Sequence, residues 1–182
     1  MKRSDINPMP PNFARYIDLV PDVELGQAFD DSDRQLDELD KDLLEELGDN
    51  YYAPGKWTVK DILQHLADSD RIMAYQALML ARKDEKVLSG FDQELHVKNA
   101  NAVRRTADEM IEEIKVARAS TVSLFNSFDE EMLLRKAINW KYEISVLAMG
   151  FTIIGHQTHH LRIIEERYLP LVGAKRLEAR GE

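Results

Sequence analysis

The chain of 182 residues has no cysteine, and it contains only 8 glycines and 6 prolines. The lack of cysteine excludes disulfides, thiolate metal ligands and a cysteine nucleophile. Few glycines and prolines suit long helices with few tight turns. Basic runs are also missing, and 24 Lys and Arg against 33 Asp and Glu give a net charge of -9. Nucleic acids and anionic membranes attract clustered cations, so we expect neither as a partner.

No apolar run is long enough to cross a bilayer, which takes about 20 residues. The longest run, residues 144–155, is interrupted by Ser145 and Thr152 and leads directly into histidines and charges. It therefore predicts a buried helix. The first residues also lack the apolar stretch of a signal peptide, and we expect a cytoplasmic protein.

Apolar stripes and capping signals predict long helices over residues 32–47, 58–84, 106–127 and 145–169. Three of the predicted helix starts have the spacing of a capping box, in which a Ser or Thr is followed three residues later by Gln, Asp or Glu. These starts are Ser32, Thr58 and Thr106.

The connections are predicted from shorter patterns. Residues 85–105 form a long connection with a helical turn near 94–101, residues 129–135 a short helix, and residues 139–143 a loop or small hairpin. No segment shows a convincing strand alternation. The chain therefore predicts an all-α fold, a four-helix bundle with a long crossover connection.

One domain accounts for a chain of this length. We expect an extended N-terminal lead-in over residues 1–29 that packs on the body, because it holds four of the six prolines and an apolar group around Phe13 and Ile17. The bundle itself is expected over residues 30–170. Residues 171–182 form a charged C-terminal tail.

Three histidines are the most informative residues of the sequence. His156 and His160 are four residues apart, so on a helix they share one face. They continue the core stripe that begins at Val146, whereas His159 is directed toward an edge. His65 lies on the second predicted helix. Two histidines at this spacing and a third from another helix make a three-nitrogen site with an open position, as in catalytic zinc sites and their nickel or cobalt relatives.

The alternative is that these are hydrogen-bonded interior histidines. Burying an imidazole whose lone pair has no partner costs on the order of several kcal/mol, as for other buried polar groups. Asp61 or a backbone carbonyl could orient His65, and Asp61 or Asp68 could serve as a general base. His96 lies in a polar connection and has no assigned role.

Aromatic and basic residues near these motifs have mostly structural interpretations. Trp57 precedes a helix start and is expected to plug the core, and Trp140 and Tyr142 could line the mouth of a pocket. Arg71 and Arg82 could hold an anionic substrate, although surface arginines are commoner.

Two stretches of the chain resemble the DinB/YfiT-like superfamily. They are residues 52–68, which contain Gln64-His65-Leu66, and residues 155–168, which contain Gly155-His156-Gln157-Thr158-His159-His160. The match also covers residues 88–92 and 116–121, so the resemblance spans about residues 30–170.

The resemblance implies a four-helix bundle with an unusual helix order, often in a homodimer. It also implies a divalent metal, typically nickel or zinc, held by His65, His156 and His160, the residues reached by spacing. His159 falls in the doubled-histidine position and is not expected to be a ligand. Members of the superfamily include metal-dependent hydrolases and enzymes that transfer thiols such as bacillithiol or mycothiol.

Three functions remain open. A metal held by three neutral histidines could activate water in a hydrolase acting on an unknown small molecule. The same position could bind a thiolate in a thiol S-transferase. The third hypothesis is a non-catalytic bundle whose metal ties two helices together, which predicts no reactive pocket beside the site.

Overall fold

The computed structural model describes residues 1–84, 90–139 and 142–172. Helices dominate it, with a single two-stranded hairpin among these residues. Four long helices form the bundle: α2 (Leu25–Asp37), α4 (Val59–Ala81), α6 (Ala107–Asn126) and α8 (Val146–Ile163). The shorter elements are η1 (Arg3–Asp5), α1 (Pro11–Ile17), α3 (Lys41–Leu47), α5 (Gln93–Ala100), η2 (Ala102–Arg104), α7 (Glu130–Leu134), β1 (Lys136–Asn139), β2 (Tyr142–Ser145) and η3 (Ile164–Tyr168).

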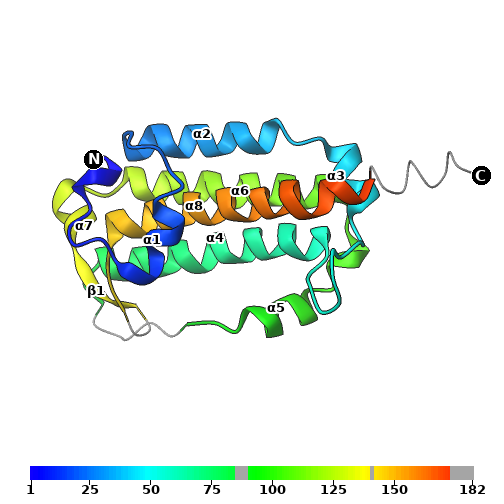
Figure 1. Ribbon diagram of the computed structural model, residues 1–182. Helices are drawn as coiled ribbons and strands as arrows, with labels where there is room; N and C mark the ends of the chain where they lie inside the picture. Colours follow the sequence, from blue (N-terminus) through cyan, green and yellow to red (C-terminus); the bar gives the residue numbers. More distant parts are fainter. Residues whose placement is uncertain (85–89, 140–141, 173–182) are drawn as a thin grey trace, which may run out of the picture.

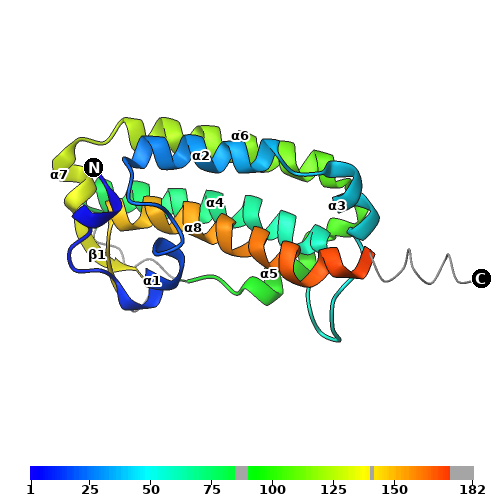
Figure 2. The same ribbon diagram turned by 45° about the horizontal axis from the view of Figure 1, so that its top comes forward.

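The long helices form two layers of a bundle, as predicted. α2 and α6 make one layer and α4 and α8 the other (Figures 1 and 2). Each helix also contacts one helix of the other layer, α4 against α6 and α2 against α8. The two helices that carry the candidate histidines, α4 and α8, are therefore direct neighbours.

The long connection between α4 and α6 has a geometric cause. Figure 1 shows that these neighbouring helices run in the same direction, so the chain must return along the bundle before α6 begins. A helix of 23 residues is roughly 35 Å long, which no tight turn can span. The return path carries α5, close to the helical turn expected at residues 94–101. Residues 85–89 of this connection, including part of the matched stretch 88–92, lie outside the described residues.

Capping residues set the starts of three long helices. Thr58 and Thr106 form the predicted capping boxes with Asp61 and Glu109, and the Ser145 side chain accepts a hydrogen bond from the Ala148 amide. Each box satisfies two backbone amides that would otherwise lack a partner. β1 and β2 pair antiparallel and form the hairpin expected before α8.

The predicted helix over residues 32–47 is wrong, because two helices occupy this region. α2 begins at Leu25, and Ser32 lies buried inside it, where its hydroxyl donates to the Phe29 carbonyl. The chain leaves the helix near Asp40, whose carboxylate accepts from the Leu43 amide and caps α3. An Asp that caps a new helix competes with continuation of the old one.

The N-terminal lead-in is not simply extended, which corrects the expectation for residues 1–29. It contains α1, which packs along α8, and the start of α2. Gly155 allows this close approach, since a Cβ there would lie 2.0 Å from the Tyr16 carbonyl oxygen. Ile17, the last residue of α1, is fully buried. The lead-in therefore forms part of the bundle surface next to the histidines.

The last helix does not end before Pro170, contrary to the prediction. A π-helical turn, η3, follows α8, and helical conformation continues to residue 172. Proline lacks an amide hydrogen and crowds the carbonyl four residues earlier, and a wider turn just before it relieves both problems. Residues 173–182 of the predicted tail lie outside the described residues.

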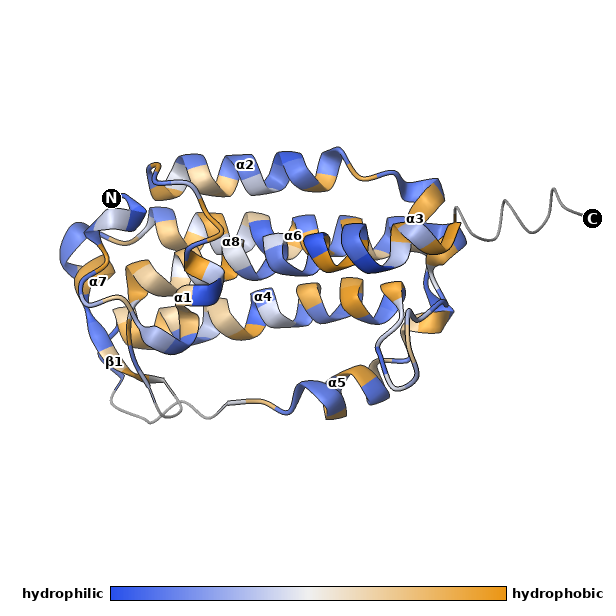
Figure 3. Cartoon of the chain, in the orientation of Figure 1, coloured by the Kyte–Doolittle hydropathy of each residue, from blue (hydrophilic) through white to orange (hydrophobic). Residues whose placement is uncertain are grey.

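Apolar residues fill both ends of the bundle interior. One cluster centres on α8 and the N-terminal segment, the other on α3 and the first halves of α4 and α6. Figure 3 shows hydrophilic residues along α2 and α5 and more hydrophobic colours in the first half of α8. Within the described residues, no helix is long and apolar enough to cross a membrane.

Candidate metal centre

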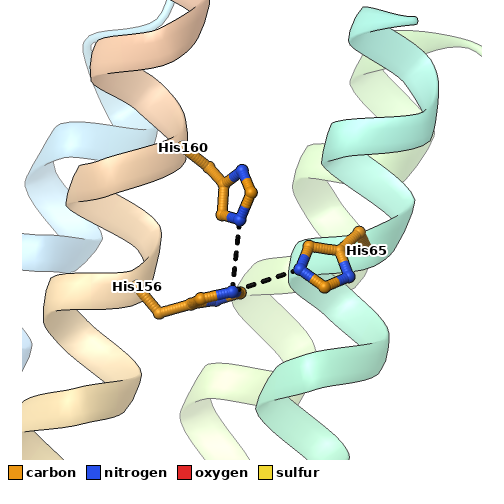
Figure 4. Close-up of side chains that lie close together, drawn as sticks. All are labelled: His65, His156 and His160. Carbon is orange, nitrogen blue, oxygen red and sulfur yellow. Dashed lines mark hydrogen bonds between the residues drawn. The ribbon is translucent and has the colours of Figure 1, made fainter. Parts of the chain in front are cut away.

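Three buried histidines meet between α4 and α8 at mid-bundle. His65 comes from α4, and His156 and His160 come from successive turns of α8 (Figure 4). Their side chains point toward one another, and one ring nitrogen of each lies within 4.8 Å of the others. The structure therefore brings together the three residues that sequence spacing selected. His159 is half-buried and is not part of this group of nitrogens.

The nitrogen separations fit a shared ion. His156 Nε2 lies 3.1 Å from His65 Nε2 and 3.2 Å from His160 Nε2. Two imidazole nitrogens that bind zinc at tetrahedral angles are about 3.3 Å apart, because each zinc–nitrogen bond is about 2.0–2.1 Å long. Two of the three separations are thus close to those of a tetrahedral ligand set, and the third pair of nitrogens lies within 4.8 Å.

Hydrogen bonding alone satisfies this cluster poorly. A neutral imidazole nitrogen has either one N–H or one in-plane lone pair. His156 Nε2 faces two other ring nitrogens, and it can form an in-line hydrogen bond with only one of them. A cation between the rings would accept all three lone pairs at once, which the interior-histidine alternative does not achieve.

Burial keeps the three imidazoles neutral. It lowers the pKa of His65 to about 4 and the pKa of His160 to about 3, with the neighbouring histidines adding smaller repulsions. The pKa of His156 falls well below its usual value for the same reason. Neutral imidazole is the form that binds a metal ion, so protons do not compete for this site near neutral pH.

Aromatic rings enclose the cluster. Trp57 stacks parallel to His160 with ring centroids 6.1 Å apart and lies 4.8 Å from His65. On the other side, the Tyr16 ring meets His156 edge-on at 5.3 Å. These rings hold the imidazoles in place and exclude water from two sides. Trp57 does plug the core as expected, but its contact with two of the histidines was not predicted.

Hydrogen bonds fix part of this enclosure. The Tyr168 hydroxyl donates to the Trp57 carbonyl at 2.5 Å, and the Trp57 indole donates to Glu94 of α5 at 3.1 Å. Ser69, one turn after His65, places its hydroxyl 3.3 Å from His65 Nδ1. Nδ1 of His160 is buried with no protein partner among the described residues. A contact such as that between Ser69 and His65 orients the ring of a ligating histidine.

A cavity of about 530 Å³ opens beside the histidines. Its walls come from α1, α4, α8, the segment 90–93 and Tyr142, and His156 and Ser69 face it directly. The volume is within the range typical of small-molecule sites. A reacting group in this cavity can approach the histidine cluster from the side of His156.

Comparison with known proteins supports the same family as the sequence motifs. A model of the DinB superfamily matches residues 23–164, more than half of the chain. The chain belongs to the DinB superfamily. A relative from Oceanobacillus iheyensis, named as a candidate metal-dependent hydrolase, OB0413, is 33% identical over 118 residues. That match covers 63% of this chain and 66%, just under two thirds, of the relative.

Solved structures share the fold of this DinB protein. YfiT from Bacillus subtilis, described as a candidate metal-dependent hydrolase with an unusual four-helix bundle topology, superposes with a TM-score of 0.66 at 16% identity. The alignment covers 88% of both chains. A mycothiol-dependent maleylpyruvate isomerase superposes with a TM-score of 0.59 at 12% identity, over 88% of this chain and 62% of the isomerase. At these identities the likeness concerns the fold alone.

The two aspartates considered as orienting or basic groups, Asp61 and Asp68, do not line the cavity. The Asp61 carboxylate accepts the Thr58 amide in its capping box, so it does not orient His65. Asp68 accepts from the Gln64 side chain at 3.1 Å and is not a cavity wall residue. Both positions were inferred from one-turn spacing, which does not distinguish the cluster face of α4 from its neighbours.

The two arginines considered for anion binding, Arg71 and Arg82, do not line the cavity, in keeping with the commoner surface interpretation. Arg71 pairs with Glu113 at 2.5 Å, and Arg82 lies over the Phe128 ring at 5.6 Å. The arginine that does line the cavity is Arg15 of α1, which the sequence did not single out. Tyr142 lines the cavity. Trp140, the other aromatic residue considered for this role, lies outside the described residues. No periodic signal marks Arg15, because docking of α1 brings it to the site.

A buried ion pair lies close behind the histidines of this DinB protein. Arg118 Nε donates to Asp70 at 2.7 Å, and both side chains are only 2% exposed. Ser32 accepts from Arg118, and the Thr121 hydroxyl donates to the second oxygen of Asp70. Both charges therefore have partners that compensate for lost hydration. The network joins α2, α4 and α6 at the level where α8 presents its histidines.

Proposed function

We propose that this DinB protein is a metal-dependent hydrolase of a small molecule. In this proposal His65, His156 and His160 would hold a divalent ion, nickel or zinc, next to the cavity. The observation that carries the proposal is that the histidine cluster borders a cavity of about 530 Å³ through His156. A catalytic three-nitrogen site needs this access to a further ligand.

Each residue has a distinct part in this chemistry. When bound, a divalent ion supplies Lewis acidity that yields a nucleophile from water near neutral pH. The three imidazoles stay neutral because of their burial, so the full charge of the ion is retained. Trp57 and Tyr16 shield two sides of the cluster, which strengthens electrostatic interactions there. Ser69 contacts His65 and holds its ring.

The cavity favours an enzyme over a purely structural metal site. A structural ion would be enclosed by protein ligands and would need no adjoining space. Here the space lies next to His156 and is large enough for a substrate. The cytoplasmic location and the homodimer remain predictions from the sequence.

A thiol S-transferase is the second candidate, and the composition of the cavity walls favours it. Among the described residues, no aspartate or glutamate lines the cavity, so no carboxylate is placed to act as a general base. A thiol is more acidic than water and needs less help to ionise at a metal. The shared fold of the mycothiol-dependent isomerase is compatible with this alternative.

The test compares hydrolysis with thiol transfer in one set of proteins. Wild-type protein, His156→Ala and the neighbouring control His159→Ala are stripped with a chelator and reloaded with zinc or nickel. 4-Nitrophenyl esters report hydrolysis, and 1-chloro-2,4-dinitrobenzene with cysteine or bacillithiol reports thiol transfer. We expect metal-dependent ester hydrolysis in wild type and His159→Ala and about 100-fold less in His156→Ala. Metal-independent turnover, or equal rates in both variants, would overturn the proposal. Metal-dependent thiol transfer without hydrolysis would establish the alternative.

A further inference from the structure

One wall of the cavity lies outside the part of the chain that matches the DinB superfamily model. That model covers residues 23–164, whereas α1 spans Pro11–Ile17. α1 contributes several of the cavity-lining residues, including Phe13, Arg15 and Tyr16. What this wall binds must therefore be inferred from the side chains of α1 themselves.

Arg15 is the only charged side chain among the described residues that line the cavity. No ion pair joins its guanidinium to a carboxylate of the described residues, although the protein as a whole carries a net charge of -9. One guanidinium nitrogen donates to the Tyr16 hydroxyl at 2.7 Å. Since a guanidinium has five N–H donors, about four remain for a ligand.

Contacts with Tyr16 place Arg15 near the histidines. Its guanidinium carbon lies 4.5 Å from the centroid of the Tyr16 ring. That ring in turn contacts both His156 and His159 at 5.3 Å. The close backbone contact of Tyr16 with Gly155, the residue before His156, holds α1 directly on the histidine helix. An anion at Arg15 would therefore lie in the same cavity as His156.

The rest of the cavity suits a partly apolar molecule. Phe13, Met73 and Phe91 provide apolar walls, and Asn12 and Gln93 provide neutral hydrogen-bonding groups. Arg15 is exposed at the cavity and is the only cation among the described residues that line it, so it can pair with one negative charge of a ligand. The planar donor pair of a guanidinium matches a carboxylate.

We propose that the cavity binds a small monocarboxylate substrate whose carboxylate pairs with Arg15 and whose apolar part lies against Phe13 and Phe91. The bond to be cleaved then lies on the side of His156. This assignment rests on the proposed function for the reaction, but the pairing with Arg15 does not require a bound metal. Arg15 sets which molecules enter and how they are oriented, and it takes no part in bond cleavage.

The test measures ligand binding rather than activity. Dissociation constants for benzoate and hexanoate, and for the neutral benzamide and hexanamide, are measured by calorimetry or ligand-detected NMR. Metal-stripped and zinc-loaded proteins are both used, and zinc content is determined in the same samples. The variants are Arg15→Gln, Arg15→Lys and the control Arg34→Gln, which removes an exposed charge on α2. Circular dichroism establishes that each variant is folded.

We expect wild-type protein to bind the carboxylates about 10-fold more tightly than the amides. Arg15→Gln should abolish this preference in both metal states without changing zinc content, Arg15→Lys should keep part of it, and Arg34→Gln should keep all of it. Carboxylate affinity within about twofold of wild type in Arg15→Gln, or no preference for carboxylates in wild-type protein, would overturn the assignment. Failure to bind zinc would count against the proposed metalloenzyme, while the effect of Arg15 on stripped protein would still decide this inference.

Discussion

Replacing Gly155 by alanine tests whether α1 docks on the histidine helix by direct backbone contact. The added Cβ would lie 2.0 Å from the carbonyl oxygen and 2.5 Å from the carbonyl carbon of Tyr16. Both atoms are backbone, so no side-chain rotation can relieve the overlap, and α1 must move away by about 1 Å or more. Overpacking of this kind costs about 1–3 kcal/mol. Alanine's greater helix preference offsets about 0.5–1 kcal/mol of that cost.

We therefore expect Gly155→Ala to lower the free energy of unfolding by about 1–2 kcal/mol, measured by urea denaturation. For a chain of this size, the melting temperature should fall by about 2–8 °C. Gly26→Ala is the matched control, because a Cβ at Gly26 of α2 has no atom within 4 Å. It should raise stability by up to about 1 kcal/mol. If Gly155→Ala were as stable as Gly26→Ala, the contact between α1 and α8 would be wrong.

Of three further predictions, two concern buried side chains and one concerns a helix cap. Arg118→Met should lower the free energy of unfolding by about 3–5 kcal/mol, measured by chemical denaturation, because it leaves the Asp70 carboxylate buried and unpaired. The double variant with Asp70→Leu should regain most of this stability. Additive losses would contradict the pairing. In metal-free protein, the free energy of unfolding should fall by ~2 kcal/mol per histidine as the pH is lowered from 6.5 to 5. Burial lowers the pKa of His65 to about 4 and that of His160 to about 3, so over this range only the unfolded chain takes up protons at these residues. Unfolding curves that are flat over this range would refute that burial effect. Asp40→Ala should cost about 1 kcal/mol through loss of the α3 cap, and an unchanged midpoint would argue for a continuous helix.

Local patterns predicted most of the bundle and the histidine cluster. Thr58 and Thr106 mark their helix starts because capping depends on neighbours within four residues. His156 and His160 could be placed on the core stripe because helical periodicity fixes which residues share a face. His65 required a long-range assumption, and the family resemblance supported it.

The rest depended on contacts between distant segments. A break at Asp40 reflects two competing continuations of similar local preference, which sequence alone does not rank. Arg15 lines the cavity because α1 packs closely against Gly155. A glycine within a helix does not indicate which distant segment will pack against it. Asp61 and Asp68, considered as bases but not assigned from the sequence, show the same limit, since a position one turn away can still face a different neighbour.

Metal content tests the central claim most directly. Untagged wild-type protein, His65→Ala and His159→Ala are purified alike, dialysed against equimolar zinc and nickel, and analysed by plasma mass spectrometry. Our account predicts about one divalent ion per chain in wild type and His159→Ala, and a loss of affinity of about 100-fold or more in His65→Ala, which removes one nitrogen of the cluster. Equal metal content in the two variants, or no bound ion in the wild-type protein, would contradict a metal centre at these histidines.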